Sequence, residues 1–296
     1  MKPWLGIAVS GAGLVLMHTA SAQQSPAAVS FEQQQAINNK IKRIAPVGLG
    51  DRPIQQTPAQ LAQRRSWEPT PPPADPRDFS GTWAMINGHL DLIQDDGNQA
   101  PFTAAEAEST KRLIAAEESG NVVTDAPSQC FPHGTPRLTI TPGYPIRFAY
   151  LPGTILMLHE VAHNVRTIHM NQAEPPKGTP RTFLGYSTGR WEGNTLAVTT
   201  SLFNKNTRID SVTSHGPRLK VVERFTKEKT PEGLTNMAVQ ITINDPDHFY
   251  KEFSISRKLG FRSELEKSVG SDGITEYSCE ENNRNVPNEQ GIVTAK

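Results

Sequence analysis

From Pro127 onward the chain consists of short apolar runs separated by Pro, Gly and Asn, and this pattern limits the fold more than any other feature. The runs are "RLTI", "IRFAYL", "TILMLHEVAHNVRTIHM", "RTFLGYSTGRWEG", "NTLAVTTSLF", "LKVVERFTKE", "LTNMAVQITIND" and "FYKEFSISRKL". In one run Met237, Val239 and Ile241 alternate with polar or small residues, as the two faces of a strand require. Turn residues such as "EGNT" and "TPEGL" separate the runs, so the pattern predicts an antiparallel meander.

A meander of about eight strands closes into a barrel or folds into a sandwich, because open sheet edges invite aggregation. Gly81-Thr82-Trp83 and Gly189-Arg190-Trp191 each begin a predicted strand, as the Gly-x-Trp opening does in lipocalin-like barrels. An aromatic plug at one end of a barrel accounts for both tryptophans without a ligand. We therefore predict a mainly β fold, an antiparallel meander that closes into a lipocalin-like barrel.

The first 22 residues have the layout of a cleaved secretory signal. They carry one positive charge at Lys2, an apolar run from Leu5 to Met17, and Ala20-Ser21-Ala22 before Gln23. The apolar run is shorter than the roughly 20 residues that span a bilayer. We therefore expect a signal peptide over residues 1–22, no membrane span, and a periplasmic or secreted mature protein.

The rest of the chain divides by composition into two parts. Residues 23–78 are rich in Gln and Pro and end in "EPTPPPADPRDF", which predicts an extended leader or wrapping arm. Residues 79–296 suit a single β-rich domain. One helix is expected on its N-terminal side, from Ala104 to Ser119, because Thr103 and Glu106 form a capping box and Gly120 follows its end.

Composition and missing motifs narrow the function. The formal net charge is zero and no Lys/Arg cluster forms a stripe, so we expect no nucleic-acid partner. The sequence contains no Gly-rich phosphate loop, no dinucleotide fingerprint and no G-x-S-x-G elbow. The missing motifs therefore argue against a nucleotide-dependent enzyme and against a serine hydrolase. We expect a protein that uses no cofactor.

Cys130 and Cys279 are the two cysteines of the chain. An oxidising compartment favours a disulfide between them, which is the interpretation that we prefer. Two buried thiols are the alternative. Without a third cysteine, a cysteine-based metal site is not expected.

The stretch "HEVAHNVRTIH", from His159 to His169, has two possible interpretations. As a helix it would place His159 and His163 on one face, where they could share a zinc ion with Glu160 as the base and His169 as a third ligand. The corresponding zinc-protease pattern needs glycine for a sharp turn where this chain has Arg166. The departure argues against the helix.

The strand interpretation fits the local composition better. Thr, Ile, Val and Leu are frequent from Thr154 to Met170, and strand-rich sequence lies on both sides. In one continuous strand the odd-numbered residues, including all three histidines, would share a face opposite Glu160, Asn164 and Arg166. Successive residues on one face lie about 7 Å apart, so one strand cannot bring three histidines to one ion.

The motifs "CFPHGTPR", "AHNVRTIHM", "GYSTGRWEGNTLAV", "HGPRLKVVERF" and "EYSCEEN" resemble, in this order, those of a family of secreted, mostly uncharacterised bacterial proteins with a GRWEGNTL-type signature. The resemblance spans Phe79 to Asn283. It implies a calycin-like barrel, a strand through His163 and Arg166, and counterparts of both cysteines. Asn194 and Thr199 stand where that family often has Asp, so no carboxylate role carries over to them.

The preferred function is cofactor-independent acid-base chemistry, of the lyase, hydratase or isomerase type, on a small and largely apolar molecule such as an aromatic or terpenoid. Histidine titrates near neutral pH and a nearby arginine can stabilise an oxyanion. The alternatives are a non-catalytic carrier of a small ligand and a zinc-dependent hydrolase. The candidate catalytic residues are His163, Arg166, His133 and Glu160, and the candidate substrate-binding residues are Arg137, Tyr144, Arg190, Trp191 and His215.

Overall fold

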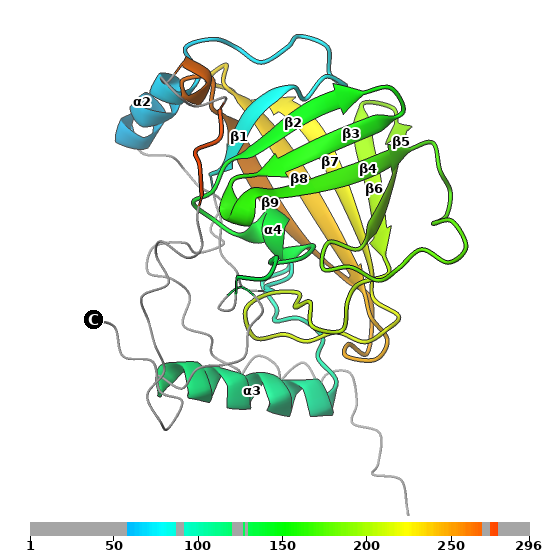
Figure 1. Ribbon diagram of the computed structural model, residues 1–296. Coiled ribbons are helices and arrows are strands. Elements are labelled where there is room, and N and C mark those ends of the chain that lie inside the picture. The colour runs from blue at the N-terminus through cyan, green and yellow to red at the C-terminus, as the bar shows by residue number, and fades with distance from the viewer. Residues whose placement is uncertain (1–57, 87–91, 120–126, 128–129, 268–272, 278–296) are drawn as a thin grey trace, which may run out of the picture. The chain divides into compact units, whose positions relative to one another are not determined.

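The computed structural model describes residues 58–86, 92–119, 127, 130–267 and 273–277, and within them the chain forms a closed β-barrel of nine strands (Figure 1). The predicted fold class is therefore confirmed. The predicted signal peptide and most of the leader lie outside the described residues. The strands are β1 (Gly81–Met85), β2 (Ile146–Leu151), β3 (Thr154–His159), β4 (Asn164–Met170), β5 (Tyr186–Glu192), β6 (Thr195–Ser201), β7 (Lys220–Lys229), β8 (Thr235–Asn244) and β9 (Phe253–Phe261).

Each strand pairs with its neighbours in sequence, and β1 pairs with β9 to close the barrel. Every pairing is antiparallel except the one between β4 and β5, which run parallel over a short register that includes Ile168 opposite Ser187. Parallel neighbours need a long crossover, and residues 171–185 supply it. The meander order is thus as expected, with one change of direction that the turn residues did not reveal.

Helices lie beside and across one end of the barrel. The predicted helix is present as α3 (Ala104–Glu118), and the Thr103 hydroxyl accepts a hydrogen bond from the Glu106 amide at 3.3 Å. "RLTI", expected as a strand, instead forms the short buried helix α4 (Arg137–Ile140), which lies at the same end of the barrel as α3 (Figure 1). A four-residue apolar run fits either structure, so burial of all its residues decided the outcome.

In the part of the chain that the structure describes, no helix is long and apolar enough to cross a membrane.

The "HEVAHNVRTIH" stretch is neither a helix nor one continuous strand. Strand β3 ends at His159, a 3₁₀ turn covers Val161–His163, and β4 begins at Asn164. Ala162 and His163 have positive φ values of 53° and 46°, which reverse the chain. The single strand predicted through Arg166 is therefore wrong at the turn. The alternation expected after the turn is present, because Asn164 and Arg166 point inward and Val165 points outward.

The barrel core is aromatic near its closing seam. Trp83 is fully buried, its indole N–H donates to the Phe79 carbonyl at 2.9 Å, and its ring meets Phe261 edge to face. Phe79 in turn packs against Phe148 and Trp191. This arrangement agrees with the aromatic plug expected from the Gly-x-Trp pieces.

The described end of the leader, residues 58–78, contacts the barrel. It begins with α2 (Pro58–Trp67), where buried Arg64 donates to the Asn236 side chain at 2.9 Å. The Lys227 ammonium then contacts three backbone carbonyls of the Pro-rich segment, those of Pro73, Asp75 and Asp78. One cation therefore holds a segment whose prolines cannot join a sheet.

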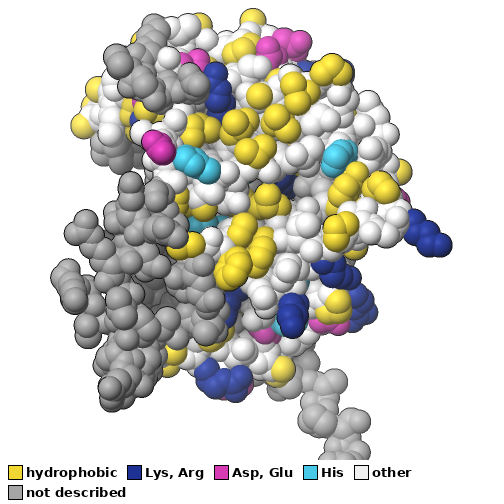
Figure 2. Space-filling view, viewed as in Figure 1, with side chains coloured by type: hydrophobic (Ala, Val, Ile, Leu, Met, Phe, Trp, Pro, Cys, Tyr) yellow, Lys and Arg dark blue, Asp and Glu magenta, His cyan; other side chains and the backbone are white. Residues whose placement is uncertain are grey.

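Apolar side chains lie on the outward face of β2 to β4, among polar ones. Figure 2 shows hydrophobic side chains gathered over these strands, and Leu151 and Val165 are each about half exposed.

Candidate functional site

A buried ion pair between Arg166 and Glu223 forms the centre of the barrel's polar interior. The Arg166 guanidinium donates to Glu223 Oε2, and the two side chains are 1% and 0% exposed. Arg166 is on β4 and Glu223 on β7, so the pair crosses the barrel between strands that are not neighbours. Charges this deep are held only where a partner compensates the loss of hydration.

Three hydroxyl groups complete the surroundings of the pair. Arg166 donates from Nε to Ser187 Oγ at 3.0 Å and from Nη2 to Thr200 Oγ1 at 2.7 Å. Thr139, on α4, donates to the second oxygen of Glu223 at 2.7 Å. The helix that replaced the expected "RLTI" strand therefore contributes directly to this interior.

The alternation of each strand explains why these charges point inward. In β7 the buried positions are Val221, Glu223 and Phe225, so the carboxylate occupies a place that the pattern reserves for apolar residues. Arg166 occupies the equivalent place in β4, between buried Asn164 and Ile168. Two opposite charges at apolar positions of separate strands form one buried pair.

His159 lies inside the barrel at the end of β3. Its ring is 2% exposed, and neither ring nitrogen has a hydrogen-bond partner within the described part of the protein. Burial lowers the His159 pKa to about 3, with smaller contributions from Arg166 and His133. The imidazole is therefore neutral, with one N–H to donate and one lone pair to accept.

His133, in the segment that leads into α4, lies close enough to His159 to lower its pKa, and Arg137, the first residue of α4, acts in the same way on His133. Burial, with a smaller contribution from the Arg137 charge, lowers the His133 pKa to about 4. His133 is only partly buried, whereas Arg137 is 7% exposed. We use the term interior polar cluster for His133, Arg137, His159, Arg166 and Glu223.

Gly134 allows the backbone beside His133 to take its path. Its φ is +78°, and an added Cβ would lie 2.4 Å from the Thr207 methyl carbon and 2.7 Å from the Phe183 carbonyl oxygen. Only glycine fits both the conformation and the space.

Two of the predicted catalytic residues lie outside the barrel. His163 is on the β3–β4 turn, where its Nε2 accepts a hydrogen bond from the Tyr277 amide at 2.8 Å. Glu160 accepts hydrogen bonds from the amide and hydroxyl of Thr275. Tyr144, a predicted substrate contact, packs edge to face against Tyr277. These residues bind the segment 273–277 and do not join the interior polar cluster.

The three histidines of the zinc alternative point in different directions. His159 faces the interior, His163 is on the turn, and His169 stacks on Tyr186 at the outer surface with ring centroids 4.5 Å apart. Across the described residues, no group of three His, Cys, Asp or Glu side chains is arranged to hold a metal ion. The geometry gives the zinc alternative no support.

The remaining predicted contacts also have partners within the protein. Arg190 is exposed and forms a surface ion pair with Glu192, while Trp191 packs on Phe79. The two ring nitrogens of His215 face the carbonyl oxygens of Gly216 at 2.7 Å and Asn204 at 3.0 Å. None of the three belongs to the interior polar cluster.

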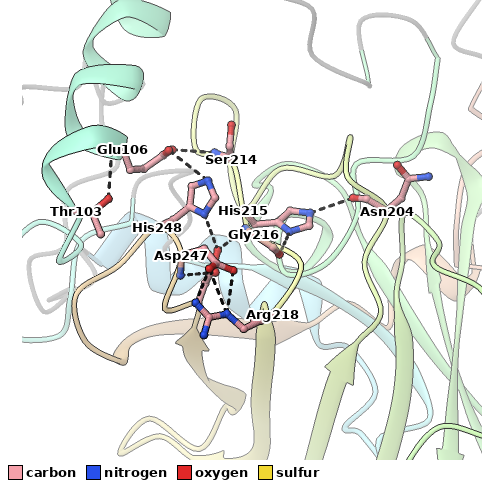
Figure 3. A network of polar contacts seen from close by, with 10 residues as sticks. Thr103, Glu106, Asn204, Ser214, His215, Gly216, Arg218, Asp247 and His248 are labelled. Atoms are coloured by element: carbon pink, nitrogen blue, oxygen red, sulfur yellow. Dashed lines mark hydrogen bonds and ion pairs between the residues drawn. The ribbon is translucent and has the colours of Figure 1, made fainter. Parts of the chain in front are cut away.

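A second polar network lies at the N-terminus of α3 (Figure 3). His248 stands between two carboxylates, with Nδ1 3.2 Å from Asp245 Oδ2 and Nε2 3.6 Å from Glu106 Oε2. The close contact with the Asp245 carboxylate raises the His248 pKa, and Glu106 adds to the effect against the opposing influence of burial. Glu106 accepts from the Ser214 amide at 3.1 Å, and the Thr103 amide donates to the His248 carbonyl at 2.8 Å, so the Glu106 side chain does not close the expected capping box.

Two surface pockets lie away from the interior polar cluster. One, of about 600 Å³, is lined by Pro71, Arg147 and Phe261 where the leader crosses β1 and β9. The other, of about 180 Å³, is lined by Tyr186, Thr199 and residues of the 217–220 segment. Neither includes a histidine.

The sequence alone identified only part of the cluster. His133, Arg137 and Arg166 were candidates, whereas His159 entered only as a zinc ligand and Glu223 was missed. The signal that could have found Glu223 is an acid at an apolar position of the "LKVVERF" alternation, matched by Arg166 at an apolar position of another strand.

Cys130 is exposed, and Cys279 lies outside the described residues, so the disulfide stays a prediction. Comparison of the chain with models of known families, with curated proteins and with solved structures finds no match.

Proposed function

We propose that the barrel acts on a small, largely apolar molecule by cofactor-independent acid-base chemistry, and that the interior polar cluster is where it does so. The observation that carries the proposal is His159, a fully buried imidazole whose two nitrogens have no partner among the described residues. Most buried polar groups have hydrogen-bond partners, and a catalytic role or a bound molecule is one explanation of an exception. A ligand with a polar group would supply that partner.

The apolar character of the ligand follows from the neighbours of the cluster. Met157, which precedes His159 on the inward face of β3, is fully buried, and so are Ile168 and Phe225. A pocket with mostly apolar walls and a few oriented polar groups is typical of sites for small molecules.

The roles divide according to exposure. His133 is partly exposed, so it can exchange protons with solvent, and we assign it the transfer of a proton to and from the substrate. His159 is neutral and buried, and we assign it the hydrogen bond to the oxygen on which negative charge develops. Arg166 holds this arrangement through its pair with Glu223.

One observation favours a carrier as the second candidate. The lowered pKa values, about 4 for His133 and about 3 for His159, make both imidazoles weak bases. General catalysis is most efficient when the pKa of the base lies near the working pH. A protein that only holds a polar ligand has no such requirement.

Small molecules that co-purify with the mature protein distinguish the candidates. They are identified by mass spectrometry and then incubated with the protein in D₂O. An enzyme incorporates deuterium or converts the compound, and His133→Gln and His159→Gln reduce that rate while the exterior variant His163→Gln keeps it. A compound that stays bound, unlabelled and unchanged in the presence of wild-type protein would establish the carrier.

We further propose a periplasmic or secreted location, which the layout of residues 1–22 supports. N-terminal sequencing of protein recovered from outside the cytoplasm should begin near Gln23.

A further inference from the structure

We propose that the interior polar cluster binds its ligand through a single oxyanion, the oxygen of a phenol or of an enol, held between the His159 imidazole and the Arg166 guanidinium. This inference rests on the proposed function and names the substrate class of the same site.

His159 and Arg166 lie on neighbouring strands, at positions that face the barrel interior. Met157 lies directly opposite Arg166 in the β3–β4 register, and His159 is two residues beyond Met157 on the same inward face. Diagonal neighbours of this kind lie about 7–8 Å apart at the backbone, within reach of a long arginine side chain. The Arg166 charge also lowers the His159 pKa, so the guanidinium lies near the imidazole, and we place one ligand atom between them.

The hydrogen bonds of Arg166 to the protein determine which of its N–H groups can still donate to a ligand. Arg166 Nε and Nη2 are used by Ser187, Thr200 and Glu223. Nη1 has two N–H groups, and its one described contact is with the Met157 sulfur at 4.0 Å. The thioether is a weak acceptor, so Nη1 retains most of its capacity to donate.

A carboxylate is not the ligand group that we expect Arg166 and His159 to prefer. Carboxylates pair with arginine through two parallel hydrogen bonds from two guanidinium nitrogens. Glu223 and the hydroxyls already occupy two of the three nitrogens of Arg166. One N–H from Nη1 and one from His159 suit a single oxygen instead.

The proton that the ligand loses on binding must also be accounted for. A phenol that binds as its anion, ArOH → ArO⁻ + H⁺, must release the proton elsewhere. His159 and His133 have pKa values of about 3 and 4, so neither retains it near neutral pH, and it passes to the solvent. The site thus stabilises the anion without becoming protonated itself.

The test uses para-nitrophenol, whose anion is coloured and whose neutral form is not, and para-nitroanisole, which has the same ring but cannot form an oxyanion. The absorbance of the phenol is titrated with pH in the presence of wild-type protein. We expect the pKa of the bound phenol to fall by at least about one unit, a tenfold preference for the anion. We also expect the anisole to bind at least about tenfold more weakly.

His159→Gln should abolish most of the shift, and His163→Gln, on the exterior turn, should leave it unchanged. A phenol that binds but stays neutral, with the anisole bound equally well, would overturn the inference and leave the proposed function intact. If neither compound binds to wild-type protein, the inference fails together with the proposed binding of apolar rings. The wild-type comparison holds even if His159→Gln does not fold.

Discussion

The two polar networks of this protein both contain histidine, yet their surroundings shift its pKa in opposite directions. In the interior polar cluster, His159 is buried beside cationic Arg166, and its pKa falls to about 3. At the N-terminus of α3, His248 lies between Asp245 and Glu106, and its pKa rises (Figure 3). At fully buried His159 burial is the larger cause and the Arg166 charge adds to it, whereas at half-buried His248 the carboxylates outweigh burial.

The difference also separates a structural network from a candidate site. At α3 each group meets an opposite charge or a backbone amide, and the network joins the helix to loops of the barrel. In the interior polar cluster the carboxylate is used by Arg166 and Thr139, and His159 has no partner within the described residues. His248 thus faces two carboxylates that can pair with its charge, whereas neither nitrogen of His159 has such a partner and a ligand could supply one.

The largest expected effect comes from removing the carboxylate of the interior pair. Glu223→Gln leaves the Arg166 charge buried without compensation and should cost about 3–5 kcal/mol of unfolding free energy, measured by urea denaturation. Glu192→Gln, which breaks exposed ion pairs with Arg190 and Arg224, is the matched control and should cost at most about 1 kcal/mol. Equal costs for the two variants would contradict the importance assigned to the interior pair.

The next largest effect is the change in stability with pH that we expect from the neutral His159. Because its folded pKa lies below the ordinary 6.5, unfolding takes up a proton on acidification, and stability is lost as pH falls from 6.5 toward about 3. The loss should reach about 2 kcal/mol between pH 6.5 and 5, at about 1.4 kcal/mol per unit.

His159→Gln should remove that part of the acid sensitivity and leave the part due to His133. The stability of His163→Gln should follow the wild type at each pH. An unchanged acid slope in His159→Gln would show that the imidazole is protonated in the folded protein.

A smaller effect of opposite sign is expected at His248. A raised pKa means that its stabilisation is fully present below the ordinary 6.5 and is lost as pH rises through the folded value. His248→Gln should therefore cost about 1–2 kcal/mol in weakly acidic solution and less in alkaline solution. A cost that grows with pH would reverse the comparison between the two networks.

The smallest effect concerns a cation whose described contacts are all backbone carbonyls. Lys227→Met removes the contacts to Pro73, Asp75 and Asp78, and should cost about 1 kcal/mol. Limited proteolysis should then cut the 69–78 segment faster than in the wild type. An unchanged rate of cleavage would show that α2, and not Lys227, keeps residues 69–78 on the barrel.

Local pattern predicted well where one face of a strand is apolar. The alternation from Met237 to Ile243 became β8, and the capping residue Thr103 began α3 where expected. Prediction failed for "RLTI" and at Ala162, where local propensity favoured a strand. In both places, packing against distant parts of the chain outweighed the small energies of propensity.

The candidate site was harder to predict because its members are far apart in sequence. Arg137 and Arg166 were identified as cations near histidines, but His163 was chosen in place of His159. One continuous strand would have put both histidines on the same face, so the pattern could not separate them, and the 3₁₀ turn put them on opposite sides of the barrel wall. A one-residue change in register exchanges the two faces of a strand, so the turn decided which imidazole lies inside.

The sequence by itself determined a mainly β barrel, its strand order and the inward alternation of most strands, because a period of two residues is a local property. The tertiary structure alone decided that Arg166 pairs with Glu223, that His159 lies near Arg166, and that α4 brings Thr139 to Glu223. Those contacts depend on barrel closure and on the register between strands, to which residues throughout the chain contribute at once.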